Sequence, residues 1–259
     1  MQDLIVSLIQ TPLYWEDPVG NRAMLEEKIA EIDTTDVIVL PEMFTTSFTN
    51  NAAQFAEPMN LNTFKWMKQL ASQSGACIVG SYAVKEGTNF FNRLLWMQPD
   101  GTFYTYDKRH SFRMSDEHKV YTAGNKQLIV EYKGWKIAPF ICYDLRFPVW
   151  SRNTNNKYDL AIYVANWPAA RAHAWKSLLP ARAIENISFV IGLNRIGTDG
   201  LGLEYSGDSV VHDFKGAPLA ELNSEEKTET FVLSKKALIE FREVFPAYLD
   251  GDEFKLGLE

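Results

Sequence analysis

The sequence predicts a layered α/β domain in which strands alternate with helices. Short apolar runs rich in Val and Ile, such as residues 4–9 and 36–40, are typical of buried strands. Segments between such runs carry apolar residues at helical spacing, as in residues 21–32 and 61–74. Hairpin-linked strands follow, for example around Pro99-Asp100-Gly101. Mixed strands with helices between them favour an α/β fold built from packed layers.

The N-terminal part begins with the strand at residues 4–9, which is followed by an amphipathic helix at 21–32 and a short strand at 36–40. We expect Gly75 to end the second helix at 61–74, because glycine readily adopts the left-handed conformation found at helix C-termini. Three further strands complete this part of the chain. They are expected at residues 77–84, 91–98 and 103–106.

The C-terminal part opens with residues 108–125, which are polar and lack periodicity, so we expect an irregular loop there. A second loop is expected in the glycine-rich segment 197–207. Strands are expected at 128–132, 135–141, 160–164, 188–194, 208–214, 218–221 and 229–233, and helices at 147–153, 172–186 and 235–244. Because no linker-like Pro/Gly/Ser tract or internal repeat occurs, we interpret residues 1–259 as a single domain.

Composition and charge exclude several classes of protein. A net charge of -7 is the opposite of the basic surplus that nucleic-acid-binding proteins usually carry, so no nucleic-acid partner is expected. No apolar run reaches membrane-spanning length, and the N-terminus lacks the basic region of a signal peptide. Only two cysteines occur, Cys77 and Cys142, which is no disulfide framework. We therefore expect a cytoplasmic protein with reduced thiols and no membrane association.

The apolar strand at residues 135–141 runs directly into Cys142, and Tyr143, Asp144 and Arg146 follow. A strand that ends at a cysteine and turns into a helix exposes the sulfur and directs free backbone N–H groups toward whatever the sulfur attacks. Both features favour a thiolate and a neighbouring oxyanion. Alone, a free cysteine is more often a small core residue, as we expect for Cys77 inside its strand.

Two other predicted strands also lead to charged residues, Glu42 and Lys108. Because a buried unpaired charge is costly, we expect these side chains to meet each other and Cys142 in one pocket. Glu42 is then placed to take the thiol proton and pass it to a leaving amine. Lys108 and the backbone N–H of Tyr143 are placed to stabilise the oxyanion. This chemistry requires no cofactor and no metal, and none of the four histidines has a metal-ligand spacing.

The sequence resembles the nitrilase, or carbon–nitrogen hydrolase, superfamily. The resemblance rests on motifs in the family's order: LPEMF at 40–44, YDKRH at 106–110, ICYDLRFP at 141–148, NWP at 166–168 and RAIEN at 182–186. It implies a four-layer αββα sandwich that assembles as a homodimer or a higher homo-oligomer. It also implies Glu42 as general base, Lys108 as oxyanion stabiliser and Cys142 as nucleophile. A second active-site glutamate is expected, for which Asp116 and Glu117 both qualify and the spacing back from Ala123-Gly124 favours Glu117.

Substrate-binding residues are expected around the nucleophile. Arg146 is interpreted either as a clamp for a substrate carboxylate or as the partner of Asp144 or Glu185 in an internal salt bridge. Four more residues are expected at the pocket mouth, although Trp167 and His173 fit a packing role equally well. These four are Tyr143, Asn166, Trp167 and His173.

The resemblance is strongest to the bacterial ω-amidase branch, which implies hydrolysis of the terminal amide of small 2-oxo dicarboxylate monoamides such as 2-oxoglutaramate and 2-oxosuccinamate. An alternative within the superfamily is a hydrolase of N-carbamoyl compounds or other small amides. A third hypothesis is a catalytically silent αββα module that binds partners. The presence of Glu42, Lys108 and Cys142 together argues against that hypothesis.

Overall fold

The computed structural model describes residues 2–257 of the chain. Its first sheet has the strand order β15-β1-β2-β4-β5-β6, and β3 pairs with β4 at one side. The strands of this sheet are β1 (Leu4–Gln10), β2 (Val37–Val39), β3 (Glu57–Pro58), β4 (Cys77–Glu86), β5 (Asn89–Met97), β6 (Phe103–Asp107) and β15 (Lys227–Leu233). Strand β2 runs parallel to β1 and β4, so its C-terminal end lies at the same edge as theirs.

The second sheet has the order β14-β13-β10-β9-β8-β7. Its strands are β7 (Val130–Tyr132), β8 (Trp135–Ile141), β9 (Leu160–Ala165), β10 (Phe189–Asn194), β13 (Val210–His212) and β14 (Pro218–Glu221). Strands β8, β9 and β10 are parallel neighbours, so their C-terminal ends share one edge. A separate hairpin pairs β11 (Ile196–Thr198) with β12 (Glu204–Ser206).

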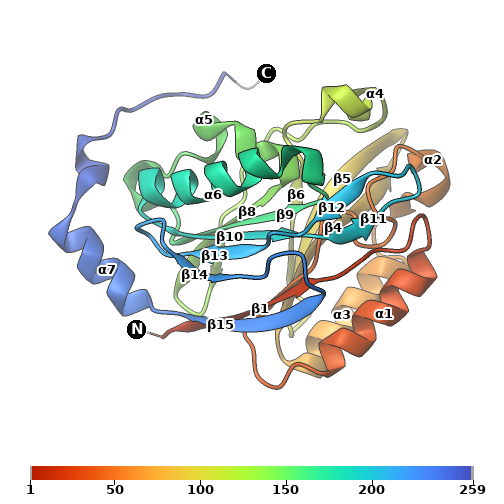
Figure 1. Ribbon diagram of the computed structural model, residues 1–259, viewed down its shortest axis with the longest axis horizontal. Coiled ribbons are helices and arrows are strands. Elements are labelled where there is room, and N and C mark those ends of the chain that lie inside the picture. Colours follow the sequence, from red (N-terminus) through yellow and green to blue (C-terminus); the bar gives the residue numbers. More distant parts are fainter. Residues whose placement is uncertain (1, 258–259) are drawn as a thin grey trace.

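The helices of the described residues are α1 (Pro18–Ala30), α2 (Ala52–Phe55), α3 (Asn62–Ser74), α4 (Glu117–Val120), α5 (Pro148–Ser151), α6 (Ala172–Asn186) and α7 (Lys235–Val244). Of these, α1, α3, α5 and α6 cover the outer faces of the two sheets, whereas α7 lies beyond one end of them (Figure 1). Figure 1 shows α1 and α3 below the stacked sheets and α5 and α6 above them. The sheets face each other where β1 packs on β10 and β5 on β8. The layers follow the order helix, sheet, sheet, helix, which confirms the predicted αββα sandwich.

Alternation along the central strands explains why both faces of the first sheet are apolar. Val37 and Val39 of β2 belong to the core between the two sheets, whereas Ile38 belongs to the core between the first sheet and helices α1 and α3. Successive strand residues point to opposite faces, so a strand covered on both sides is apolar throughout. This is why the strands could be recognised as unbroken apolar runs in the sequence.

Most predicted elements are present, and Gly75 ends α3 in the left-handed conformation as expected. The expectation of an irregular loop at 108–125 was wrong in part, because α4 and a 3₁₀ turn at Arg113–Ser115 lie within it. The glycine-rich segment 197–207 likewise contains part of the β11–β12 hairpin. Elements this short carry too few residues for a periodic pattern, and α2 and β3 were missed for the same reason.

Within residues 2–257, no helix combines the length and the apolar character that crossing a membrane requires.

Candidate active site

Cys142 is the first residue after strand β8 and the first of a 3₁₀ turn, Cys142–Arg146. Its φ of 45° lies in the left-handed region, which a residue with a side chain adopts only when its surroundings enforce it. The backbone N–H of Ile141 donates to Asp144 Oδ2 at 3.1 Å and closes this turn. The strand-to-helix turn expected at the cysteine is therefore present, and it holds the sulfur at the end of the strand.

Glu42 follows β2 after Leu40-Pro41, and its carboxylate is fully buried. Oε1 accepts a hydrogen bond from Lys108 Nζ at 2.8 Å and another from Asn92 Nδ2 at 2.8 Å. Oε2 accepts the backbone N–H of Asn166 at 2.8 Å. Three donors, one of them cationic, therefore satisfy the hydrogen-bonding capacity of this buried carboxylate.

Lys108 follows β6 and bridges two buried carboxylates. Its Nζ lies 2.8 Å from Glu42 Oε1 and 2.9 Å and 3.0 Å from the two oxygens of Glu117. The Lys108 side chain is only 3% exposed, so water contributes little to the solvation of the ammonium. Removal of either carboxylate would leave a larger share of this charge uncompensated.

The choice between the two acidic candidates for the second glutamate is decided by their surroundings. Glu117 is fully buried, and its Oε2 accepts the backbone N–H of Phe112 at 2.6 Å in addition to the Lys108 contact. Asp116 is exposed and pairs with Lys119 at 3.0 Å on the surface. Glu117 is therefore the acid that belongs to this cluster.

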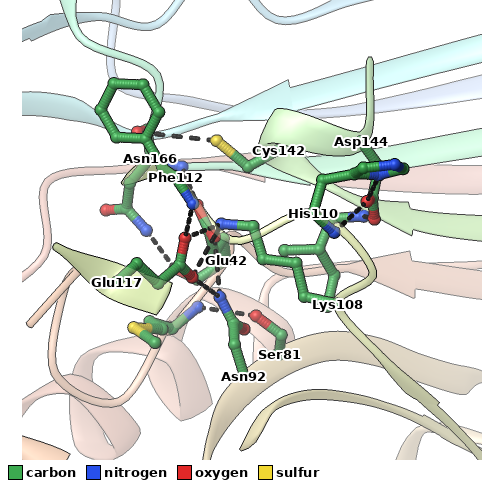
Figure 2. A network of polar contacts seen from close by, with 12 residues as sticks. Glu42, Ser81, Asn92, Lys108, His110, Phe112, Glu117, Cys142, Asp144 and Asn166 are labelled. Carbon is green, nitrogen blue, oxygen red and sulfur yellow. Dashed lines mark hydrogen bonds and ion pairs between the residues drawn. The ribbon is translucent and has the colours of Figure 1, made fainter. Parts of the chain in front are cut away.

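The expected convergence of three strand ends is confirmed. Figure 2 shows the Lys108 ammonium between the carboxylates of Glu42 and Glu117, with the Cys142 sulfur facing the same space. Glu42, Lys108 and Cys142 also line one cavity of about 530 Å³. The first two come from the first sheet, and Cys142 comes from the second, so the site lies where the edges of the two sheets meet.

Burial and neighbouring charges set the protonation of the cluster. Burial raises the pKa of the Cys142 thiol well above its ordinary value, Glu42 raises it further, and Lys108 opposes both. Burial alone would lower the pKa of Lys108, but Glu117 and Glu42 together raise it well above its ordinary value. Burial also raises the pKa of Glu117, against the opposing effect of Lys108. At neutral pH the cluster therefore contains an ammonium and a neutral thiol.

Comparison with known proteins identifies the family. Residues 5–237 match the carbon-nitrogen hydrolase family. The chain belongs to this family.

Among related proteins, omega-amidase YafV of Escherichia coli strain K12 is 49% identical, and the match covers 99% of this chain and 100% of that protein. A 2-oxoglutaramate amidase of Bacillus subtilis strain 168 is 34% identical, with 95% of this chain and 96% of that protein covered.

The fold of this carbon–nitrogen hydrolase is shared with solved structures. A CN-hydrolase superfamily protein from Xanthomonas campestris, described as carrying an arsenic adduct in its active site, is 48% identical with a TM-score of 0.97, covering 99% of this chain and 100% of that one. A Saccharomyces cerevisiae member of branch 10 of the nitrilase superfamily is 22% identical with a TM-score of 0.83, covering 95% of each chain. The second likeness concerns the fold alone.

Four of the five residues expected to bind substrate line the cavity: Tyr143, Arg146, Asn166 and Trp167. The expectation for His173 was wrong, because this side chain is exposed and lies outside the cavity lining. It belongs to the first turn of α6, whose inward face is formed by Trp175 and Leu179 instead. Arg171, in the 3₁₀ turn before α6, reaches the cavity in its place.

The internal salt bridge considered for Arg146 is absent. Asp144 accepts hydrogen bonds from other groups, and Glu185 pairs with Arg182 at 3.0 Å. The Arg146 guanidinium lies 5.1 Å from the centre of the Trp167 ring, and no carboxylate of residues 2–257 is within ion-pair distance of it. An arginine that lines a cavity without an internal partner is available to a ligand.

Several site residues were missed by the sequence analysis. Asn92 donates to Glu42 at 2.8 Å and to Glu117 at 3.4 Å from within β5, and Phe112 supplies the backbone N–H that holds Glu117. The only sequence signal for Asn92 was a polar residue inside an otherwise apolar strand. Residues 2–257 contain no group of three or more His, Cys, Asp or Glu side chains arranged to hold a metal ion.

The protonation state of the site leads to a prediction about thiol reactivity. We expect iodoacetamide to alkylate Cys142 in preference to Cys77, because Cys77 is fully buried and burial raises its pKa to about 12. Since the Cys142 pKa is also raised, the rate should climb with pH beyond pH 9 as the thiolate fraction grows. Glu42→Gln removes the carboxylate whose charge, in addition to burial, raises the pKa of Cys142. We therefore expect Cys142 of this variant to be alkylated faster at neutral pH than Cys142 of the wild type. Peptide mass mapping over a pH series measures both effects, and preferential labelling of Cys77 would contradict the assignment.

Proposed function

We propose that this carbon–nitrogen hydrolase is an ω-amidase, which hydrolyses the terminal amide of small 2-oxo dicarboxylate monoamides such as 2-oxoglutaramate and 2-oxosuccinamate. One observation supports the chemistry above all others: a buried ammonium shared by two carboxylates lies beside a cysteine that opens into the same cavity. The relatives named omega-amidase and 2-oxoglutaramate amidase, which match over nearly the whole chain, support the substrate class.

In the acylation half, Glu42 accepts the thiol proton as Cys142 sulfur attacks the amide carbon. The carbon–sulfur bond forms, and the carbonyl electron pair moves onto oxygen. The Lys108 ammonium and the backbone N–H of Tyr143 stabilise this oxyanion. Glu42 then passes its proton to the amide nitrogen, the carbon–nitrogen bond breaks, and ammonia leaves behind a thioester.

Water completes the cycle. Glu42, ionised again, takes a proton from a water molecule that attacks the thioester carbon. The second oxyanion forms in the same place and collapses with cleavage of the carbon–sulfur bond. The proton held by Glu42 returns to the Cys142 sulfur, and the dicarboxylate product leaves. In this scheme Glu117 does not exchange protons; it holds the Lys108 ammonium charged and directed at the oxyanion.

We further propose that Arg146 binds the carboxylate of the substrate. It lies four residues past the nucleophile, its guanidinium packs on Trp167, and the residues the structure describes supply it with no carboxylate. Tyr143 and Asn166 contribute the remaining polar surface near the sulfur, and Asn166 is itself held by Glu42. Guanidinium matches carboxylate geometry through two parallel hydrogen bonds, which suits recognition of a 2-oxo acid.

The cellular setting belongs to the same proposal. We propose that the enzyme works in the cytoplasm as a homodimer or higher homo-oligomer, which is what the nitrilase resemblance implies.

Cys142→Ala should abolish ammonia release from 2-oxoglutaramate, because no other group can form the acyl-enzyme. Cys77→Ala is the matched control and should retain activity, since Cys77 packs in the core away from the cavity. A coupled assay for ammonia measures both. Turnover by the Cys142→Ala variant would refute the mechanism, and faster release from an N-carbamoyl amine than from 2-oxoglutaramate would redirect the substrate assignment.

Lys108→Met should lower kcat by at least about 10²–10³-fold, the usual effect of losing one oxyanion donor. It should also lower the free energy of unfolding by roughly 3–5 kcal/mol, because two buried carboxylates lose their counter-charge. In the double variant Lys108→Met/Glu117→Gln one of these charges is gone, so stability should partly return while activity does not. Urea unfolding and steady-state kinetics check this, and activity that returned together with stability would contradict the role of Lys108.

Arg146→Met should weaken kcat/KM for 2-oxoglutaramate by about 10- to 150-fold, equivalent to roughly 1.5–3 kcal/mol for hydrogen bonds between charged groups. Methionine retains much of the length and apolar bulk packed on Trp167. Propionamide, which lacks a carboxylate, serves as the matched control substrate and should be hydrolysed by variant and wild type at similar rates. An equal loss on both substrates would show that Arg146 supports the fold of the site instead of binding the carboxylate.

A further inference from the structure

Asp144 is a fully buried carboxylate that the proposed mechanism does not use. Its two oxygens accept four hydrogen bonds. Oδ1 accepts the backbone N–H of His110 at 3.0 Å and the His110 ring Nδ1 at 2.8 Å (Figure 2). Oδ2 accepts Tyr106 Oη at 2.6 Å and the backbone N–H of Ile141 at 3.1 Å. Because a carboxylate only accepts, the His110 ring carries its proton on Nδ1.

These contacts fix the chain on both sides of Lys108. Tyr106 lies two residues before Lys108 and His110 lies two residues after it, and both donate to Asp144. Both donors are held in turn: Trp150 Nε1 donates to Tyr106 Oη at 2.9 Å, and the His110 ring stacks on Phe147 with centroids 3.7 Å apart. The lysine is therefore the central residue of a short segment anchored at two points to one carboxylate.

The same carboxylate fixes the chain on both sides of Cys142. Ile141, the preceding residue, donates its backbone N–H to Asp144, which itself lies two residues after the cysteine. This closed turn encloses the left-handed backbone of Cys142, where φ is 45°. The bond therefore helps to hold a non-glycine residue in that conformation.

We infer that Asp144 is a positioning residue, whose carboxylate ties the Lys108 segment of the first sheet to the Cys142 turn of the second. It sets the place of the ammonium relative to the sulfur without touching the substrate. The inference rests on the proposed function for the roles of those two residues. Catalysis is sensitive to such placement, because an error of about 1 Å in a reacting group can cost about 10²-fold in rate.

The chain contains a matched control for a merely structural role. Asp159 is also a buried carboxylate, and it accepts hydrogen bonds from the backbone N–H of Lys136 at 2.9 Å, from Arg242 at 2.8 Å and from Lys235. It lies just before β9, at the opposite end of the strands whose C-terminal ends carry the site. Asp159→Asn therefore breaks a comparable buried network far from the cavity.

The experiment compares Asp144→Asn with Asp159→Asn in the full-length enzyme, at a temperature where circular dichroism shows each to be folded. The amide that replaces the carboxylate has only one acceptor oxygen, so it cannot satisfy all four donors around position 144. We expect kcat for 2-oxoglutaramate to fall about 10²-fold in Asp144→Asn with KM nearly unchanged. Asp159→Asn should lower the melting temperature and leave kcat at the wild-type value.

The rate of Cys142 alkylation by iodoacetamide gives a readout that needs no amide substrate. Lys108 lowers the Cys142 pKa, so displacement of the ammonium in Asp144→Asn should slow alkylation at neutral pH, whereas Asp159→Asn should match the wild type. If the wild-type enzyme had no amidase activity, the proposed function would be refuted. The comparison of Cys142 alkylation rates among the wild type and the two variants would still test the role of Asp144.

The inference would be overturned if folded Asp144→Asn had the same kcat and the same rate of Cys142 alkylation as the wild type. It would also be overturned if Asp159→Asn lost as much kcat as Asp144→Asn. If Asp144→Asn fails to fold, Tyr106→Phe decides, because it removes one of the four hydrogen bonds and keeps the carboxylate. A lower kcat with unchanged KM and slower alkylation in Tyr106→Phe supports positioning. Wild-type values for both would overturn it.

Discussion

The structure of the site depends on one buried ammonium. Lys108 is almost completely removed from water, and two carboxylates from different parts of the chain, those of Glu42 and Glu117, lie within 3.0 Å of it. A buried charge with one partner is at best marginally stable, so the second carboxylate and the surrounding N–H donors are needed to hold it. The elements that carry these groups must therefore meet. Strands β2 and β6 must end close together to bring Glu42 to Lys108, and α4 must lie against them to bring in Glu117.

The thiol reaches this charged cluster from the other sheet. Parallel strands β8 and β9 end side by side, so Cys142 and Asn166 emerge at the same edge. Asn166 donates its backbone N–H to the Glu42 carboxylate and its side-chain N–H to the Glu42 carbonyl oxygen, which joins the two sheets directly. The packing of sheet on sheet therefore serves the chemistry: one sheet supplies the charges, and the other supplies the nucleophile.

The sequence predicted the parts of this arrangement that have a strong local signal. Glu42 and Cys142 follow apolar strands, Lys108 follows the return strand of a hairpin, and a charged or reactive residue directly after a strand is easily noticed. Glu117 required the family resemblance, because it begins a four-residue helix too short to show periodicity. Asn92 was missed because its role depends on pairing across the fold, and His173 was misplaced because the rotation of a helix about its axis is fixed by tertiary packing.

The charge balance of the cluster explains why a thiol, and not a preformed thiolate, suits this cavity. A thiolate would place a further negative charge beside the carboxylates of Glu42 and Glu117, in buried surroundings that solvate it poorly. In the proposed mechanism the proton moves to Glu42 as negative charge appears on the substrate oxygen beside Lys108. The net charge of the buried cluster then stays constant through the attack. The negative charge only changes place within the cluster, toward the ammonium that the fold has fixed there, so this route avoids the solvation penalty that a free thiolate would meet in the same site.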